Sequence, residues 1–279
     1  MINPFGILFH PLAIEQFIDN TVNGKIFNQQ DVFFHNEMYH CFDAHSSLNN
    51  ISEDDIIKTL NSKVVDTLEF LKNTSHIVIT LGTAWAYRHI KRDEFVANCH
   101  KIEQKQFSKE LLSINAIVKS LNRMIGLVRN INSKVEFIIT VSPVRHLKDG
   151  FVENTRSKSH LFAAIHECLD SNKNGVYYFP SYEIMMDELR DYRFYNQDMI
   201  HPNQTAIDYI WECFKKTYIN HKDQRMRQET QLTMKEVEAV QKGINHIPLN
   251  PLSAAQQKFL KSIHEKQEKL ALKHPHIQF

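Results

Sequence analysis

The segment Val135-Glu136-Phe137-Ile138-Ile139-Thr140-Val141 decides the fold, because it is an almost uninterrupted run of β-branched and aromatic residues. Runs of this kind are typical of strands covered on both faces, as in a parallel sheet. Residues 77–81 (Ile-Val-Ile-Thr-Leu) have the same character, and residues 176–179 (Val-Tyr-Tyr-Phe) form a third apolar run. A Gly or Pro turn signal follows each of the three runs. We therefore predict three buried strands.

Helical patterns separate these strands. Apolar residues recur at helical spacing within 53–73, 110–131 and 155–171, and a fourth pattern follows His201 with Pro202 at the first helical position. Strands and helices in alternation predict an α/β fold in which helices cover a parallel sheet. Because such sheets bind ligands at the carboxyl ends of their strands, the loops after the strands are where chemistry is expected.

The composition indicates one large α/β domain with an appendage. The chain has 279 residues and a net charge of +1, which gives no electrostatic reason to expect a nucleic-acid partner. No apolar run reaches the roughly 18 residues of a transmembrane segment. We place the domain at residues 1–219 and a charged helical extension at 220–279, with a linker at 246–251 and a helix at 253–272. The sequence does not indicate an oligomeric state.

The four cysteines lie far apart in the sequence and form no C-x-x-C pair. This spacing disfavours a zinc ribbon or a disulfide scaffold and favours a reducing compartment such as the cytoplasm.

Asp198 and His201 carry the most informative side chains, because they lie three residues apart before the fourth helical pattern. A neutral His is a good general base near neutral pH, and an Asp that accepts from its ring fixes its tautomer. The pair is therefore a candidate for the acid/base half of a catalytic triad. The alternative is that Asp198 caps the next helix and His201 is a surface residue.

The loop after residues 135–141 holds further candidates. Ser142 is a nucleophile by residue type, but Val141 and Pro143 flank it in place of the glycines of a nucleophile turn, which favours a strand-ending turn. Arg145 and His146 are candidate residues at the mouth of a site for a polar or anionic substrate.

Asn98 is a candidate amide donor to an oxyanion, which needs fixed N–H groups. The neighbouring Cys99 and His100 are disfavoured as a nucleophile and base, because adjacent side chains point in different directions. His35, His40 and His45 recur every five residues, and this spacing places them on neither one helix face nor one strand face. We therefore expect no metal site.

Several long strings resemble the GSCFA family, a branch of the SGNH (GDSL-like) hydrolases. The matching strings span residues 3–8, 80–85, 96–100, 140–150, 183–195 and 198–202. The resemblance implies a three-layer α/β/α, flavodoxin-like fold around a parallel sheet of about five strands. It also implies a Ser nucleophile after the first strand, a Gly after the second and an Asn after the third that form an oxyanion hole, and a D-x-x-H near the end.

Carried onto this chain, the resemblance assigns acid and base to Asp198 and His201 and the oxyanion glycine to Gly6, after what would be the second strand. The family's G-S-C-F-A string, which holds the serine, is absent and is expected before Asn3. We therefore expect a chain that lacks the first strand and the nucleophile. Gly82-Thr83-Ala84-Trp85 replaces the usual G-x-N-D block, so Asn98 and Thr83 are alternatives for the third oxyanion donor.

The expected function of the parent protein is hydrolysis of ester-type bonds in a small-molecule or glycan ester, without a metal or organic cofactor. The chain itself is expected to be inactive, because it lacks the nucleophile. The alternatives are an acyltransferase with the same triad, a non-catalytic carbohydrate- or acyl-binding domain with a relic site, and metal-dependent hydrolysis through the three histidines.

Overall fold

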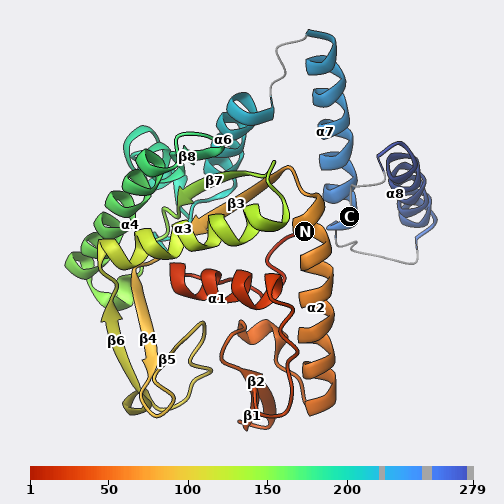
Figure 1. Cartoon of the computed structure of the whole chain (residues 1–279). Coiled ribbons are helices and arrows are strands. Elements are labelled where there is room, and N and C mark those ends of the chain that lie inside the picture. Colours follow the sequence, from red (N-terminus) through yellow and green to blue (C-terminus); the bar gives the residue numbers. More distant parts are fainter. Residues whose placement is uncertain (220–223, 247–252, 275–279) are drawn as a thin grey trace. The chain divides into compact units, whose positions relative to one another are not determined.

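The computed structural model of the chain describes residues 1–219, 224–246 and 253–274 (Figure 1). The chain forms two compact units, Met1–Ile210 and Trp211–Phe279, which are described separately.

A parallel sheet lies at the centre of the first unit. It consists of β3 (His76–Leu81), β7 (Glu136–Val141) and β8 (Val176–Phe179), with β7 in the middle. Thr140 of β7 is in register with Thr80 of β3 and Phe179 of β8, so the three strands end at the same edge. The three predicted strands and the α/β class are thereby confirmed. The described part of this sheet has fewer strands than the resemblance implies.

β3 and β7 differ in burial although their sequences look alike. Every residue of β7 after Glu136 is buried, as predicted. In β3 the last four residues instead alternate: Val78 is 54% exposed and Thr80 is exposed, whereas Ile79 and Leu81 are buried. The prediction of cover on both faces is therefore wrong for β3. The prediction of a buried strand holds only in part for β8, where Tyr177 is 41% exposed. β3 is an edge strand whose outer side pairs with no described strand, whereas β7 has a partner on each side.

The long helices of the first unit are α2 (Glu53–Asn73), α3 (Ile114–Ile131) and α4 (Phe151–Ser171), and Figure 1 shows α3 running across the sheet with α4 beside it. α2 begins as predicted, and Ser52 Oγ accepts from Asp55 N at 3.2 Å. α3 begins later than the predicted residue 110, because Ser113 caps it at Ala116 N and the preceding residues form a strand.

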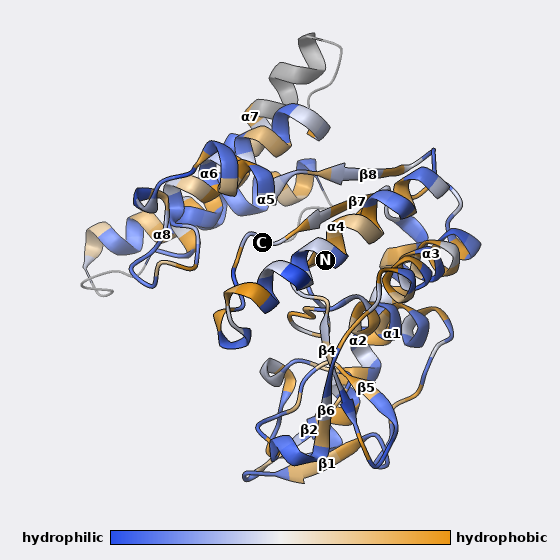
Figure 2. Ribbon diagram, turned by 90° about the vertical axis from the view of Figure 1, so that its left-hand side faces the viewer, coloured by the Kyte–Doolittle hydropathy of each residue, from blue (hydrophilic) through white to orange (hydrophobic). Residues whose placement is uncertain are grey.

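The core of the first unit joins the sheet to these helices. Ile139 of β7, Leu121 and Met124 of α3 and Leu161 of α4 are all fully buried within it. α4 also buries polar side chains, and Figure 2 shows hydrophilic and hydrophobic residues alternating along it.

Several elements were not predicted. They are α1 (Pro11–Val22), a hairpin of β1 (Val32–His35) and β2 (Met38–Cys41), and an antiparallel sheet of β4 (Trp85–His89), β5 (Glu94–Val96) and β6 (Phe107–Leu111). Shorter turns are η1 (Ser46–Leu48), η2 (Gln104–Gln106), η3 (Leu147–Asp149), α5 (Ser181–Glu183), η4 (Ile184–Glu188), η5 (Tyr192–Phe194) and η6 (Lys215–Ile219).

The helix after His201, α6 (Gln204–Phe214), begins later than predicted. Asn203 caps it, because its Oδ1 accepts from Ala206 N at 3.2 Å. Pro202 instead forms an isolated antiparallel bridge with Tyr195. The prediction of Pro202 at the first helical position is therefore wrong.

The second unit contains α7 (Gln224–Ile244) and α8 (Ala254–Lys273), which pack through Val240, Ile263 and Leu270. A Cβ at Gly243 would lie 2.4 Å from Ile263 Cδ1, so the glycine allows this close approach. The predicted linker lies outside the described residues except for His246. Among the described helices, none has the length and apolar content that a bilayer crossing requires.

Candidate functional site

Asp198 and His201 are bonded to each other in a tight turn. His201 Nδ1 lies 2.6 Å from Asp198 Oδ2, while Asp198 Oδ1 accepts from the N–H groups of Ile200 (2.8 Å) and His201 (2.9 Å). Met199 closes the turn in the left-handed region at φ +58°. Because an ionised carboxylate only accepts, the proton of neutral His201 sits on Nδ1 and Nε2 keeps a free lone pair.

The turn also holds Asp198 ionised. The backbone N–H of His201, then its side chain, lowers the pKa of the Asp198 carboxyl to about 2. Asp198 does not cap α6, since Asn203 fills that position. The capping interpretation of Asp198 is therefore wrong, although both side chains are exposed, at 45% for Asp198 and 57% for His201.

Arg145 connects this turn to the loop after β7. Its Nη2 donates to Met199 O, and its guanidinium lies 5.4 Å from the centroid of the Tyr195 ring. Two loops that the sequence singled out separately are thus joined by one side chain.

Gly82 and His146 meet at the carboxyl ends of β3 and β7. The N–H groups of Gly82 and Thr83 both donate to Phe9 O, at 2.8 and 3.1 Å. The His146 ring packs edge-on against Phe9 at 6.0 Å, and its Nε2 would lie 3.5 Å from a Cβ at Gly82. The structure therefore brings these two predicted residues together around Phe9.

Gly6 packs against His45, whose ring lies near Phe9 and so beside Gly82 and His146. Gly6 has φ +76°, and a Cβ there would lie 2.3 Å from His45 Cβ, so a glycine is required. The His45 ring in turn faces Phe9, with 6.5 Å between centroids. Gly6 follows a turn closed by its N–H to Asn3 O at 2.8 Å, and not the strand that the resemblance places there.

Thr83 and Asn98 both form hydrogen bonds within the fold. The Thr83 hydroxyl lies 3.0 Å from Ser157 Oγ and accepts from Trp85 N. Asn98 Oδ1 accepts from His100 N at 2.8 Å in the loop after β5. No contact found among the described residues links Asn98 to Asp198 or His201, so the oxyanion roles of Thr83 and Asn98 stay predictions.

The inner face of α4 organises this edge of the sheet, and the sequence interpretation missed it. Asn154 Oδ1 accepts from His146 N at 3.0 Å, and Ser157 Oγ accepts from Ala84 N at 2.7 Å. Lys158 Nζ donates to Gly82 O at 2.7 Å. The spacing of these three polar residues places them on one helix face, which is the only signal that the sequence offered.

Lys158 is 2% exposed, and its Nζ also donates to Ser142 O at 2.6 Å. Burial lowers the pKa of the Lys158 ammonium to about 7. Within the described residues no carboxylate forms an ion pair with it. Burial, and next the Lys158 charge, lowers the pKa of the His146 imidazole as well.

Ser142 forms the strand-ending turn that its neighbours favoured. Its Oγ accepts from Val144 N at 3.2 Å. Nowhere in the described part of the chain does a serine hydroxyl bond to His201.

The three histidines at five-residue intervals do not converge. His40 bonds to His35 O and lies 3.2 Å from His100, between their Nδ1 atoms, while His45 bonds to Ser47. The residues that the structure describes contain no group of three or more His, Cys, Asp or Glu that could hold a metal.

Burial raises the pKa of the Cys99 thiol to about 11, which disfavours a reactive thiolate at this position.

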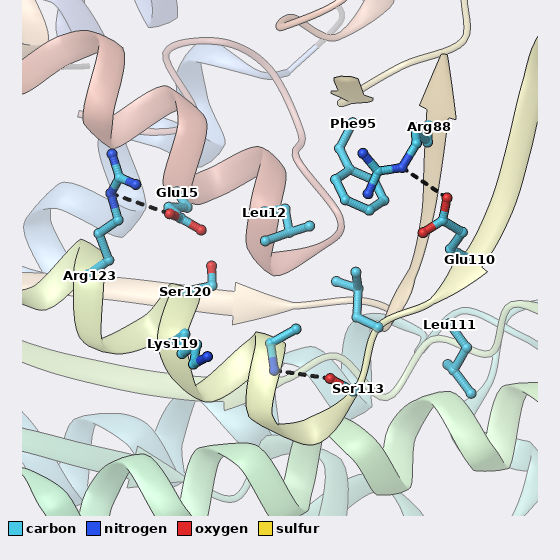
Figure 3. Close-up of a pocket in the computed structure, with 12 residues that line it drawn as sticks. Leu12, Glu15, Arg88, Phe95, Glu110, Leu111, Ser113, Lys119, Ser120 and Arg123 are labelled. Carbon is cyan, nitrogen blue, oxygen red and sulfur yellow. Dashed lines mark hydrogen bonds and ion pairs between the residues drawn. The ribbon is translucent and has the colours of Figure 1, made fainter. Parts of the chain in front are cut away.

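A separate pocket of about 530 Å³ lies between α1, the β4–β6 sheet and α3 (Figure 3). Leu12 and Phe95 supply apolar walls, and an Arg88–Glu110 ion pair of 3.0 Å lies at its rim. Figure 3 shows the Ser120 hydroxyl directed from α3 toward α1, and within the described ranges this buried oxygen has no hydrogen-bond partner. None of the predicted site residues lines the pocket.

Two family models match the chain. The model of the GSCFA family covers residues 1–214, and the model of the GSCFA domain protein, C-terminal domain, covers residues 237–279. No curated protein matches the chain. The first model spans most of the sequence and includes the parallel sheet, the α4 contacts and the Asp198–His201 turn. The chain therefore belongs to the GSCFA family.

Proposed function

We propose that the chain carries the acid/base half of an SGNH-like ester hydrolase site, with His201 as general base and Asp198 as its orienting carboxylate. The observation that carries the proposal is the 2.6 Å contact between His201 Nδ1 and Asp198 Oδ2. This contact leaves the exposed Nε2 as a base that faces solvent and substrate. A carboxylate in this position also stabilises the imidazolium that forms during proton transfer.

The proposed reaction is acyl transfer through a serine. The hydroxyl attacks the ester carbonyl while His201 Nε2 takes its proton, and the alkoxide then leaves with that proton. Water, activated by the same nitrogen, hydrolyses the acyl-enzyme and restores the serine. No metal or organic cofactor takes part in these steps.

The nucleophile in this proposal is the serine of a G-S-C-F-A string that precedes Asn3. The bonding of His201 supports this choice, because no described serine contacts it. The outer edge of β3 also supports it, because no described strand pairs with this edge. A strand beside β3 would deliver a serine to the carboxyl ends where Gly82 and His146 lie.

The substrate in this proposal is a small-molecule or glycan ester. Amide groups around Gly6 and one of Thr83 and Asn98 are the proposed oxyanion donors. Arg145 and His146 are the proposed contacts to polar substrate groups. The buried Nε of Arg145 has no hydrogen-bond partner among the described residues, which supports a role toward a ligand. An acyltransferase would use the same groups, with a sugar hydroxyl in place of water.

A binding domain with a relic site is the competing function for residues 1–279. A relic site also accounts for the absence of a serine beside His201 among the described residues. The two functions differ in their need for a general base.

The test is hydrolysis of p-nitrophenyl acetate by the protein expressed with whatever segment precedes Met1 in its reading frame. We expect His201→Ala to reduce kcat/KM by about 10²–10⁴-fold, which is the usual contribution of general acid–base catalysis. His264→Ala, in an exposed His–Glu pair of α8, is the matched control. Equal rates for wild type and His201→Ala would exclude the hydrolase proposal.

A further inference from the structure

Lys158 has the most unusual environment of any lysine that the structure describes. Its side chain leaves α4 and ends beneath the loops after β3 and β7, where Nζ donates to Gly82 O at 2.7 Å and to Ser142 O at 2.6 Å. Lysines are almost never fully buried without an acidic partner, because removing an ammonium from water is costly. A lysine that is 2% exposed and bonds only to two carbonyls therefore needs an explanation.

The position of the two carbonyls suggests that explanation. Gly82 directly follows β3 and Ser142 directly follows β7, so one ammonium bridges the ends of two neighbouring strands. The two adjacent polar residues of α4 act on the same loops. Ser157 binds Ala84 N, and Asn154 binds His146 N.

The charge of Lys158 acts on His146. The titratable groups that face His146 are Lys158 from α4, Lys109 from β6 and Asp149 from η3, with His45 beyond the Phe9 ring. Lys109 and Asp149 form an ion pair with each other, so their effects on His146 largely offset. Lys158 is the cation whose effect is not offset by a neighbouring carboxylate.

We propose that Lys158 is a positioning residue of the site, which holds the loops after β3 and β7 together and thereby places His146 beside Gly82. The importance of Lys158 for catalysis rests on the proposed function, whereas its contacts with the two loops do not depend on hydrolysis. A neutral imidazole offers one acceptor and one donor nitrogen, whereas an imidazolium only donates. His146 is therefore suited to accept a hydrogen bond from a substrate hydroxyl, such as an acylated carbohydrate presents.

The test is an NMR titration of the histidine C2–H signals in wild type, Lys158→Met and Lys158→Arg, with His146→Gln used to assign the signal. In wild type we expect His146 to titrate below the ordinary value of 6.5. Lys158→Met should raise its pKa, because a nearby cation is removed, while burial, the larger cause of the lowered pKa, stays in place. Lys158→Arg should leave it near the wild-type value, and His76 should not change in either variant.

Two results would overturn the proposal. One is a pKa of His146 at or above 6.5 in the wild-type protein, a result that can be measured even if the variants do not fold. The other is a folded Lys158→Met protein in which His146 titrates as in wild type.

Amide hydrogen exchange gives the geometric readout. In Lys158→Met we expect faster exchange at Ala84 and His146, while amides in the middle of β7 keep their protection. Unchanged exchange at Ala84 and His146 would contradict the positioning role. Neither measurement uses an ester, so a protein without hydrolase activity but with these shifts would exclude the proposed function and retain the role of Lys158.

Discussion

Two exposed histidine–carboxylate pairs lie at opposite ends of the parallel sheet, and only one is a candidate site. His201 meets Asp198 in a loop tied to the carboxyl ends of the strands. His76 meets Glu136 at 3.1 Å where β3 and β7 begin, and Ser75 Oγ even lies 2.9 Å from the His76 ring. By contact alone, the second group looks more like a complete triad than the first.

The surroundings of the two pairs separate them. Asp198 is held by two backbone N–H groups of its own turn, and Arg145 ties that turn to the loop after β7. His76 and Glu136 are cross-strand neighbours in register at the amino ends, away from the edge where open α/β sheets bind ligands. A hydrogen-bonded His–carboxylate contact therefore indicates a site only when the fold also places it at the ligand edge.

The largest expected effect comes from removing the carboxylate of each pair in the protein with its upstream segment. Asp198→Asn should lower kcat/KM for ester hydrolysis by about 10³–10⁴-fold, because His201 loses the partner that fixes its tautomer. Glu136→Gln should leave kcat/KM within about twofold of wild type, a change of about 0.4 kcal/mol. Equal losses in the two variants would remove the distinction between the two ends of the sheet.

The next effect is on the pH dependence of stability. The pKa of Lys158 is about 7 in the folded protein and near 10.5 in the unfolded chain, so the unfolded chain binds more protons between these values. Stability should therefore rise from pH 7 to pH 10 by up to about 1.4 kcal/mol per pH unit relative to Lys158→Met. Urea unfolding at several pH values measures this, with the exposed Lys119→Met as control. A constant difference between wild type and Lys158→Met would contradict it.

A smaller effect is expected at the glycines. Gly6→Ala should destabilise the fold by about 2–3 kcal/mol, because its Cβ would clash with His45 and its backbone would be strained at φ +76°. Gly24 has φ +64° but open space around its Cβ position, so Gly24→Ala should cost about 1 kcal/mol. Thermal unfolding of both variants compares the packed position of Gly6 beside His45 with the open turn at Gly24. Equal losses of unfolding free energy would mean that the packing around Gly6 is loose.

The smallest effect is on acid stability. Because the pKa of Asp198 is lowered to about 2, its contribution is present above the ordinary value of 3.8 and is lost as the pH falls through about 2. Carbon-detected NMR of the Asp198 carboxyl should show a midpoint clearly below 3.8. A midpoint at or above that value would contradict the stabilisation of the Asp198 carboxylate by the two backbone N–H groups of its turn.

The sheet and the Asp198–His201 contact are predictable from the sequence. The three strand runs predict the sheet because continuous β-branched segments have few alternatives, and the spacing of Asp198 and His201 predicts their contact because it is local. The exposure of Val78 in β3 was not predictable, since it depends on which elements cover the edge strand. The start of α3 was misread because Leu111 and Leu112 continue the apolar period across the Ser113 cap.

The polar contacts of α4 were not predictable for another reason. The helical pattern of the sequence predicts a solvent-exposed face for three polar residues, Asn154, Ser157 and Lys158. Only the tertiary structure shows that they are buried under two loops. The contact of Arg145 with Met199 O likewise joins loops 54 residues apart in sequence.

Labelling by a fluorophosphonate, which reacts with activated serines, tests most directly whether His201 activates the nucleophile. The protein is expressed with the segment that precedes Met1. The comparison is between wild type, His201→Ala and His76→Ala. We predict that labelling is lost in His201→Ala and unchanged in His76→Ala, because only the pair at the carboxyl ends activates the nucleophile. Labelling that survives His201→Ala, or that depends on His76, would contradict the assignment of the site.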